Sequence, residues 1–99
     1  MIIPKRFEMF GYTLKVVYRI NLKKNGEELL GYWQPDIQTI YLQKNTRKRP
    51  TSREVQEQAF LHEVVHAMLN NLGYDKLSAN EKLVDQLASL IHQLLKYVW

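Results

Sequence analysis

The sequence predicts an α+β fold in which a small, mostly antiparallel sheet of about four strands precedes two packed, antiparallel helices. Two patterns lead to this prediction. Residues 12–22 alternate apolar and polar side chains, and a period of two is typical of a strand with one buried face. Residues 83–98 repeat apolar side chains at i, i+3 and i+4, as an amphipathic helix does. Because strands fill the first half and helices the second, we expect a single domain over residues 1–99.

The expected strands lie within about residues 6–43 and are separated by turn-forming residues. These turn signals are Phe10-Gly11, Lys24-Asn25-Gly26 and Gln34-Pro35-Asp36. The last of them lies between residues 29–33 and residues 37–42, and this arrangement predicts a hairpin. The second arm of the hairpin is rich in β-branched residues, and we expect it to form an edge of the sheet.

The first helix is expected over about residues 52–72 and the second over about residues 79–98. Both begin with the spacing of a capping box, in which serine or threonine precedes glutamate by three residues: Thr51 with Glu54, and Ser78 with Glu81. Gly73 follows the first helix, at the position where a left-handed residue ends many helices. The short link after it should bring the two helices together in opposite directions.

The composition excludes several classes of chemistry. The chain has no cysteine, so disulfide bonds, thiolate zinc sites and a cysteine nucleophile are excluded. The net charge is +4, and part of the excess lies in a basic run at residues 44–49. This run lacks interleaved aromatic residues, so we interpret it as a solvated loop and expect no nucleic-acid partner. Residues 1–6 lack the pattern of a signal peptide and no apolar run suits a bilayer, so a cytoplasmic protein without membrane contact is expected.

The strongest chemical signal is the motif His62-Glu63-Val64-Val65-His66. Two histidines four positions apart on a helix lie on the same face, where both imidazoles can reach one zinc ion. Glu63 lies about 100° further round the helix, so it can take a proton from water at the metal. Two core histidines bonded to their neighbours are the simpler interpretation. The spacing, the helix and the apolar stripe nevertheless agree on a metal site.

A catalytic zinc site needs a third protein ligand and one open position. Without cysteine, the candidates are Asp75, Glu81, Asp85 and His92. Glu81 points at the metal if the apolar face of the second helix packs on the first helix, although the capping box offers it another role. Asp85 is expected to accept a ring N–H from a zinc histidine, unless it lies at the edge of the solvated face. His92 is an alternative ligand or transition-state stabiliser, but packing at a helix interface is the favoured interpretation.

The pattern His62-Glu63-x-x-His66 followed by Asn80-Glu81-x-x-x-Asp85 resembles the gluzincin metallopeptidases. The order of segments also resembles short phage and bacterial proteins related to the ImmA/IrrE group of metallopeptidases, and minimal gluzincins of similar size. The matching segments are Gly31-Tyr32, Ile37-Gln38-Thr39-Ile40-Tyr41, residues 61–67 and Val84-Asp85-Gln86-Leu87-Ala88. The resemblance implies that His62, His66 and Glu81 hold zinc and that Asp85 supports a zinc histidine.

One departure from the family pattern affects the expected activity. Only residues 67–80 separate His66 from Glu81, and we expect no further substrate-binding subdomain after the second helix. We therefore expect narrow proteolysis of a particular partner in place of broad digestion.

The sequence thus predicts a zinc-dependent endopeptidase of narrow specificity, with one Zn²⁺ per chain, Glu63 as the catalytic base and a protein or peptide substrate. The substrate is expected to pair, as an extended strand, with the second hairpin arm, which comprises Ile37, Gln38, Thr39, Ile40, Tyr41 and Leu42. Candidates for stabilising the oxyanion are Tyr41, Tyr74 and His92. The alternative is a catalytically weak or latent zinc-stabilised module that binds a protein or nucleic acid. A self-inhibited peptidase lies between the two, with the apolar tail Lys96-Tyr97-Val98-Trp99 as the inhibitory segment.

Overall fold

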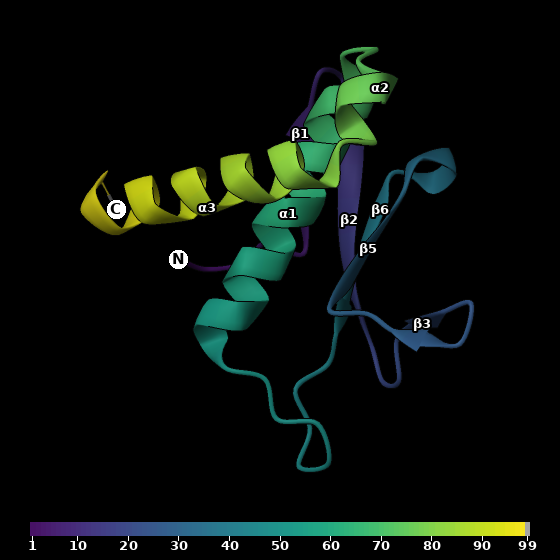
Figure 1. Ribbon diagram of the computed structural model, residues 1–99, viewed down its shortest axis with the longest axis vertical. Coiled ribbons are helices and arrows are strands. Elements are labelled where there is room, and N and C mark those ends of the chain that lie inside the picture. Colours follow the sequence, from purple (N-terminus) through teal and green to yellow (C-terminus); the bar gives the residue numbers. More distant parts are fainter. Residues whose placement is uncertain (99) are drawn as a thin grey trace.

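Strands and helices follow the expected order in the structure, a computed structural model that describes residues 1–98 (Figure 1). The strands are β1 (Arg6–Met9), β2 (Tyr12–Arg19), β3 (Lys23–Lys24), β4 (Glu27–Glu28), β5 (Gly31–Gln34) and β6 (Thr39–Gln43). A 3-10 turn, η1 (Pro35–Ile37), joins β5 to β6. The helices are α1 (Arg53–Asn71), α2 (Asp75–Ser78) and α3 (Glu81–Val98). The predicted α+β class is confirmed, and the short helix α2 is an addition to it.

The main sheet has the strand order β1-β2-β6-β5, while β3 and β4 form a separate two-stranded ribbon. β1 pairs with β2, and β5 with β6, in antiparallel fashion, whereas β2 and β6 are parallel. The parallel pair arises because the chain passes through the ribbon and β5 before β6 enters between β2 and β5. The sheet is therefore mostly antiparallel, as the sequence predicts.

The prediction that residues 37–42 form an edge of the sheet is wrong. β6 lies inside the sheet, with β2 on one side and β5 on the other. Four of its five residues are buried, as expected of a strand that is covered on both sides and on one face. Ile37 and Gln38 precede the strand, and Gln38 has a left-handed backbone with φ 47°. The edge on this side of the sheet is β5.

The long alternating strand is shorter than its pattern predicts. β2 ends at Arg19, and its buried apolar residues are Leu14 and Val16. Ile20 continues the alternation in the sequence but is exposed. Asn21 then adopts a left-handed conformation with φ 56° and turns the chain towards the ribbon. The last part of the alternating pattern thus belongs to a turn.

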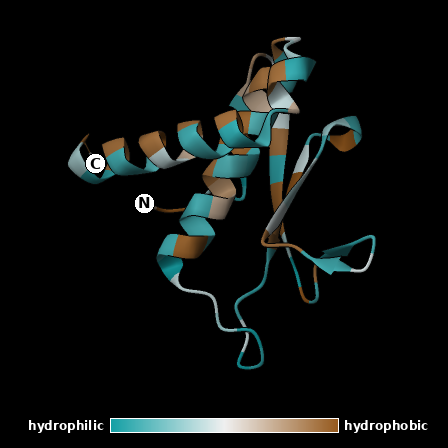
Figure 2. Ribbon diagram, viewed as in Figure 1, coloured by the Kyte–Doolittle hydropathy of each residue, from teal (hydrophilic) through white to brown (hydrophobic). Residues whose placement is uncertain are grey.

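α1 packs on one face of the sheet, and α3 packs on α1. The core between them includes Leu14, Trp33, Ile40, Leu42, Phe60, Leu61, Val65, Ala67, Val84 and Ala88. The two helices run in opposite directions, because Glu54 at the start of α1 contacts Lys96 near the end of α3, whereas His62 contacts Asp85 near the start of α3. Figure 1 shows that α3 crosses α1 obliquely. Apolar and polar residues alternate along α3 (Figure 2). Within residues 1–98, no helix combines the length and apolar character needed to cross a membrane.

The helix starts are capped by other residues than the sequence predicts. Ser52 rather than Thr51 caps α1, because its Oγ accepts a first-turn N–H at 3.2 Å. Asn80 rather than Ser78 caps α3, because its Oδ1 accepts a first-turn N–H at 3.1 Å. These single-residue caps replace both expected capping boxes. Ser78 and Glu81 are thereby available for contacts with α1.

The end of α1 is as the sequence predicts. Gly73 has a left-handed backbone with φ 87°, and its N–H donates to the carbonyl of Asn70. The N–H of Tyr74 donates to the carbonyl of Leu69 at 2.7 Å, which completes a Schellman motif. This reversal starts the link through α2 that returns the chain to the side of α1.

Candidate metal centre

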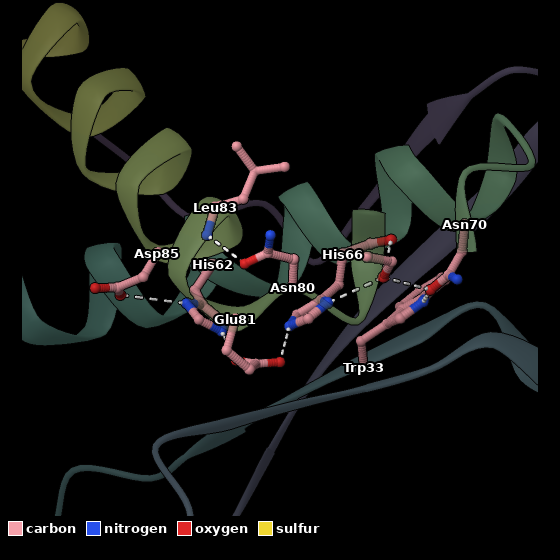
Figure 3. A network of polar contacts seen from close by, with 9 residues as sticks. Trp33, His62, His66, Asn70, Asn80, Glu81, Leu83 and Asp85 are labelled. Atoms are coloured by element: carbon pink, nitrogen blue, oxygen red, sulfur yellow. Dashed lines mark hydrogen bonds and ion pairs between the residues drawn. The ribbon is translucent and has the colours of Figure 1, made fainter. Parts of the chain in front are cut away.

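His62 and His66 project from the same side of α1, near the start of α3 (Figure 3). Their ring centroids are 5.0 Å apart, as expected for residues one helical turn apart. Burial lowers the pKa of His66, although the carboxylate of Glu81 acts in the opposite direction. Near neutral pH the His66 ring is therefore neutral, which is the form that binds metals.

Glu81, the first residue of α3, lies against both rings. Its Oε2 is 3.1 Å from Nε2 of His62, and its Oε1 is 3.1 Å from Nε2 of His66. One ligand atom from each of the three residues lies within 4.8 Å of the others, and residues 1–98 contain one such group. Two imidazole nitrogens and a carboxylate oxygen suit zinc and leave a coordination position open. The three residues expected to hold zinc thus lie together, and their donor set fits that ion.

The second ring nitrogen of each histidine also has a partner. Nδ1 of His62 is 3.5 Å from Oδ1 of Asp85, whose side chain is 68% exposed. Nδ1 of His66 is 3.0 Å from Oγ of Ser78, which is buried. The sequence predicts the contact of Asp85 with a histidine. It does not predict that of Ser78, because the spacing from Ser78 to Glu81 resembles a helix cap.

Glu63 lies on the side of α1 that faces β5, and only 7% of the residue is exposed. A Cβ at Gly31 would lie 3.1 Å from Cγ and Oε2 of Glu63. Burial raises the pKa of Glu63 to about 7; Glu81 adds to the rise, while His62 and the amide of Trp33 oppose it. A carboxyl group with a pKa near neutrality suits general acid–base chemistry.

β5 presents an unpaired edge beside Glu63. The N–H of Gln43 donates to the carbonyl of Leu30 at 2.9 Å, which sets the hydrogen-bonding phase of the β5–β6 ladder. In an antiparallel ladder the peptide groups of successive residues point alternately towards and away from the partner. The peptide groups of Gly31 and Trp33 therefore point away from β6. The amide of Trp33 is engaged by Glu63, whereas the peptide groups of Gly31 and the carbonyl of Trp33 face outwards and are available to another extended chain.

Two cavities meet at the side chain of Glu63, and Gly31 and His62 line both of them. The first has a volume of about 550 Å³, and its apolar lining residues are Leu29, Leu30, Val55 and Ala59. The second has a volume of about 590 Å³, and its polar lining residues include Lys24, His66, Asn70, Asp75, Ser78 and Glu81. Glu63 therefore lies between an apolar and a polar recess.

The three residues expected to stabilise an oxyanion lie elsewhere. Tyr41 is on the sheet face opposite α1, where it stacks on Tyr32 at 6.5 Å between ring centroids. The buried residues that flank it along β6 occupy the α1 face, so strand alternation directs Tyr41 away from the site. His92 is buried against α1, 2.9 Å from Glu57, in the packing role that the sequence favours. Tyr74 is exposed at the start of α2 and lies outside the linings of both cavities.

Two further expectations concern Asp75 and the tail. Asp75 accepts the side-chain N–H of Asn70 at 2.9 Å and is not part of the ligand group. Residues 96–98 lie at the opposite end of α3 from Glu81, so this part of the tail does not reach the histidines. Trp99, the last residue of the tail, lies outside the described residues.

Gly31 and Ser78 are the positions that motif reasoning misses. An isolated glycine within a strand is a signal of close backbone approach, and this signal is present in Gly31-Tyr32-Trp33-Gln34. Ser78 carries no comparable signal, because its role depends on Asn80 supplying the cap of α3.

Comparisons of this chain with family models, with curated proteins and with solved structures each find no match. A function is therefore inferred from the fold and the side-chain geometry. Those features are an α+β fold, a group of two histidines and a glutamate, and a buried carboxyl group beside the edge strand β5.

Proposed function

We propose that this protein is a gluzincin-like zinc endopeptidase of narrow specificity, which acts in the cytoplasm on an extended segment of a protein or peptide. The observation that carries the proposal is the position of Glu63. It adjoins the group of His62, His66 and Glu81 and also touches the free edge of β5 at Gly31. Peptide hydrolysis requires a group that activates the carbonyl, a base for water and a surface for an extended chain. Residues suited to all three tasks are adjacent here.

Different residues bind the metal and transfer the proton in the proposed reaction. His62, His66 and Glu81 would hold a zinc ion, which would supply Lewis-acid activation of water and of the substrate carbonyl. The carboxylate of Glu63 takes a proton from the attacking water and later gives it to the leaving nitrogen. Water is thereby added across the C–N bond, and Glu63 returns to its starting state.

The walls of the site define a class of substrate. The outward-facing peptide groups of Gly31 and the outward-facing carbonyl of Trp33 pair with an extended segment, as in β-strand addition. The apolar cavity beside them takes an apolar side chain next to the scissile bond, and Val55 forms part of its wall. Suitable substrates are thus flexible segments with an apolar residue at the cleavage point.

The decisive experiment combines metal analysis with peptide cleavage. Zinc-loaded protein is incubated with a library of short unstructured peptides, and the products are identified by mass spectrometry. Glu63→Gln should keep its zinc and lose roughly 10²–10⁴-fold in rate. Glu54→Gln, at an exposed position of the same helix, is the matched control and should behave as wild type.

Two outcomes contradict the proposal. Equal cleavage by wild type and Glu63→Gln removes the assigned base. Zinc binding with tight capture of a peptide but without cleavage favours the alternative function, a zinc-stabilised binding module.

A further inference from the structure

A chain of hydrogen bonds joins His66 to the edge strand β5 (Figure 3). Nδ1 of His66 is 3.0 Å from Oγ of Ser78, and this Oγ is 3.1 Å from Oδ1 of Asn70. The indole Nε1 of Trp33 is 3.0 Å from the same oxygen of Asn70. The amide nitrogen of Asn70 donates to Asp75 at 2.9 Å. Residues of β5, α1 and α2 therefore meet behind one proposed metal ligand.

The direction of these hydrogen bonds follows from Trp33. An indole nitrogen can only donate, so the atom of Asn70 that it contacts is the carbonyl oxygen. Ser78 contacts that same oxygen, and its hydroxyl must donate to it. The other oxygen near Ser78 is the main-chain carbonyl of His66 at 3.4 Å, which is also only an acceptor. Because the hydroxyl has one proton, Ser78 must accept from His66, whose Nδ1 then carries the hydrogen.

The opposite direction is less stable. If Ser78 donated to Nδ1 and Nε2–H of His66 donated to Glu81, the oxygens of Ser78 and Asn70 would face each other at 3.1 Å without a proton. Ser78 is 5% exposed and Asn70 is held by three hydrogen bonds, so neither oxygen can turn to water. Glu81 is 69% exposed at its side chain and can move. The buried end of this series of hydrogen bonds, at Ser78 and Asn70, therefore determines which atoms donate and which accept.

We infer that Ser78 is a positioning residue that holds His66 as the Nδ1–H tautomer, with the lone pair of Nε2 directed at Glu81, before any metal binds. Two acceptors, Nε2 of His66 and Oε1 of Glu81, then lie 3.1 Å apart, and a cation between them satisfies both. This role rests on the proposed zinc site, but the tautomer itself is a property of the metal-free protein. Through Asn70, the same series of hydrogen bonds connects His66 to Trp33, which lies on the strand proposed to hold substrate.

The two histidines are supported unequally. Nδ1 of His62 faces the exposed carboxylate of Asp85 at 3.5 Å, a long contact that solvent can replace. Nδ1 of His66 faces a buried hydroxyl at 3.0 Å within a closed network. Asp85→Ala should consequently reduce zinc affinity less than Ser78→Ala does.

The first experiment measures the tautomer in metal-free protein by long-range ¹H–¹⁵N correlations of the imidazole rings. Burial lowers the pKa of His66, so this ring is neutral at about pH 8 and its spectrum distinguishes Nδ1–H from Nε2–H. We expect Nδ1–H at His66 in wild type and in Ser78→Thr, which keeps the hydroxyl, and a shift towards Nε2–H in Ser78→Ala. An Nε2–H tautomer of His66 in wild type overturns the inference, and this result does not depend on any variant folding.

The second experiment measures zinc affinity by competition with a chelator. Ser78→Ala should bind zinc about 10- to 100-fold more weakly, and Ser78→Thr should restore most of the loss. Ser89→Ala is the matched control, because Ser89 is an α3 serine that accepts a hydrogen bond from Gln58 away from the histidines. Wild-type affinity and an unchanged tautomer in Ser78→Ala refute the inference. If wild type binds no zinc, the proposed zinc site fails, and the tautomer measurement alone decides the role of Ser78.

Discussion

Gly31 lies directly against Glu63, where a Cβ on the strand would come within 3.1 Å of the glutamate Cγ and Oε2. The contact limits how closely the edge of β5 and Glu63 can approach each other, because a side chain at this position would require Glu63 or β5 to shift. It also buries the carboxyl group of Glu63. One residue without a side chain thus brings the proposed base and the proposed substrate strand together.

Gly31→Ala should therefore damage turnover more than stability. The new methyl group must displace Glu63 or β5 by several tenths of an ångström, and a misplacement of this kind costs about 10- to 100-fold in rate. Zinc content should stay at the wild-type level. Steady-state cleavage, elemental analysis and thermal melting of the same sample check this. Gln34→Ala, on the same strand, is the control, and full activity in Gly31→Ala would show that the close contact is irrelevant to catalysis.

Glu81→Ala should abolish high-affinity zinc binding. Glu54→Ala is its matched control, since both remove an exposed glutamate from the first turn of a helix and both lose a helix-dipole interaction of roughly 0.3–1 kcal/mol. Only Glu81→Ala should also lose the rise in melting temperature that added zinc produces through binding to the native state. Zinc titration followed by thermal melting distinguishes the two variants. Wild-type behaviour of Glu81→Ala would show that Glu81 is not the third zinc ligand beside His62 and His66.

Val55→Asp should change which peptides are cleaved. Val55 lines the apolar cavity and is 41% exposed, so a charged side chain can be tolerated there without disrupting the core. The variant should discriminate about tenfold less in favour of an apolar residue at the cleavage point. Peptide pairs that differ only by leucine or lysine at that residue measure the effect. Val55→Ile keeps the wall apolar and should retain the wild-type preference; an unaltered preference in Val55→Asp would assign the subsite elsewhere.

Glu57 should contribute stability that is lost in acid. Its carboxylate accepts the Nε2–H of His92 at 2.9 Å, and this hydrogen bond is the main reason that the pKa of Glu57 lies below its usual value, with Arg53 adding to the effect. The folded state therefore holds the proton less tightly than the unfolded state, whose glutamate pKa is about 4.3. The contribution is complete above that unfolded value and disappears as the pH falls through the lowered folded value.

Urea unfolding across the acid range tests this dependence. Glu57→Gln should be less stable than wild type near neutrality, and its stability should fall less steeply below about pH 5. Glu54→Gln removes an exposed carboxylate nearby and should keep the wild-type slope. If the free energy of unfolding of wild type and of Glu57→Gln falls equally steeply in acid, the pair of Glu57 and His92 does not contribute to the acid dependence of stability.

Features that depend on one segment of the chain are predictable from the sequence. The helix that carries His62 and His66 and its stop at Gly73 follow from side-chain spacing and from the freedom of glycine at positive φ. The interior position of β6 is not predictable in this way, because its parallel partner β2 is distant in the sequence and a strand pattern does not identify its neighbours.

The same distinction holds within the site. The spacing of Glu81 and Asp85 on one helix predicts that both face the histidines, and the distances agree. The contact between Ser78 and His66 requires that Asn80 cap α3 and that a separate short helix precede it. These are choices among local alternatives of similar energy, and tertiary packing decides between them.

The proposed ligands and the surroundings of Glu63 differ in their separation along the sequence, and this difference predicts an order of assembly. All three proposed ligands belong to residues 62–81, a stretch that closes on itself through the reversal at Gly73 and forms with little loss of loop entropy. Gly31 and Trp33 arrive from the other half of the chain and complete the surroundings of Glu63 only when the sheet docks on α1. We therefore expect the proposed zinc ligands to come together before the surroundings of Glu63 are complete, so that a folding chain would be able to bind the metal before the proposed base is in place.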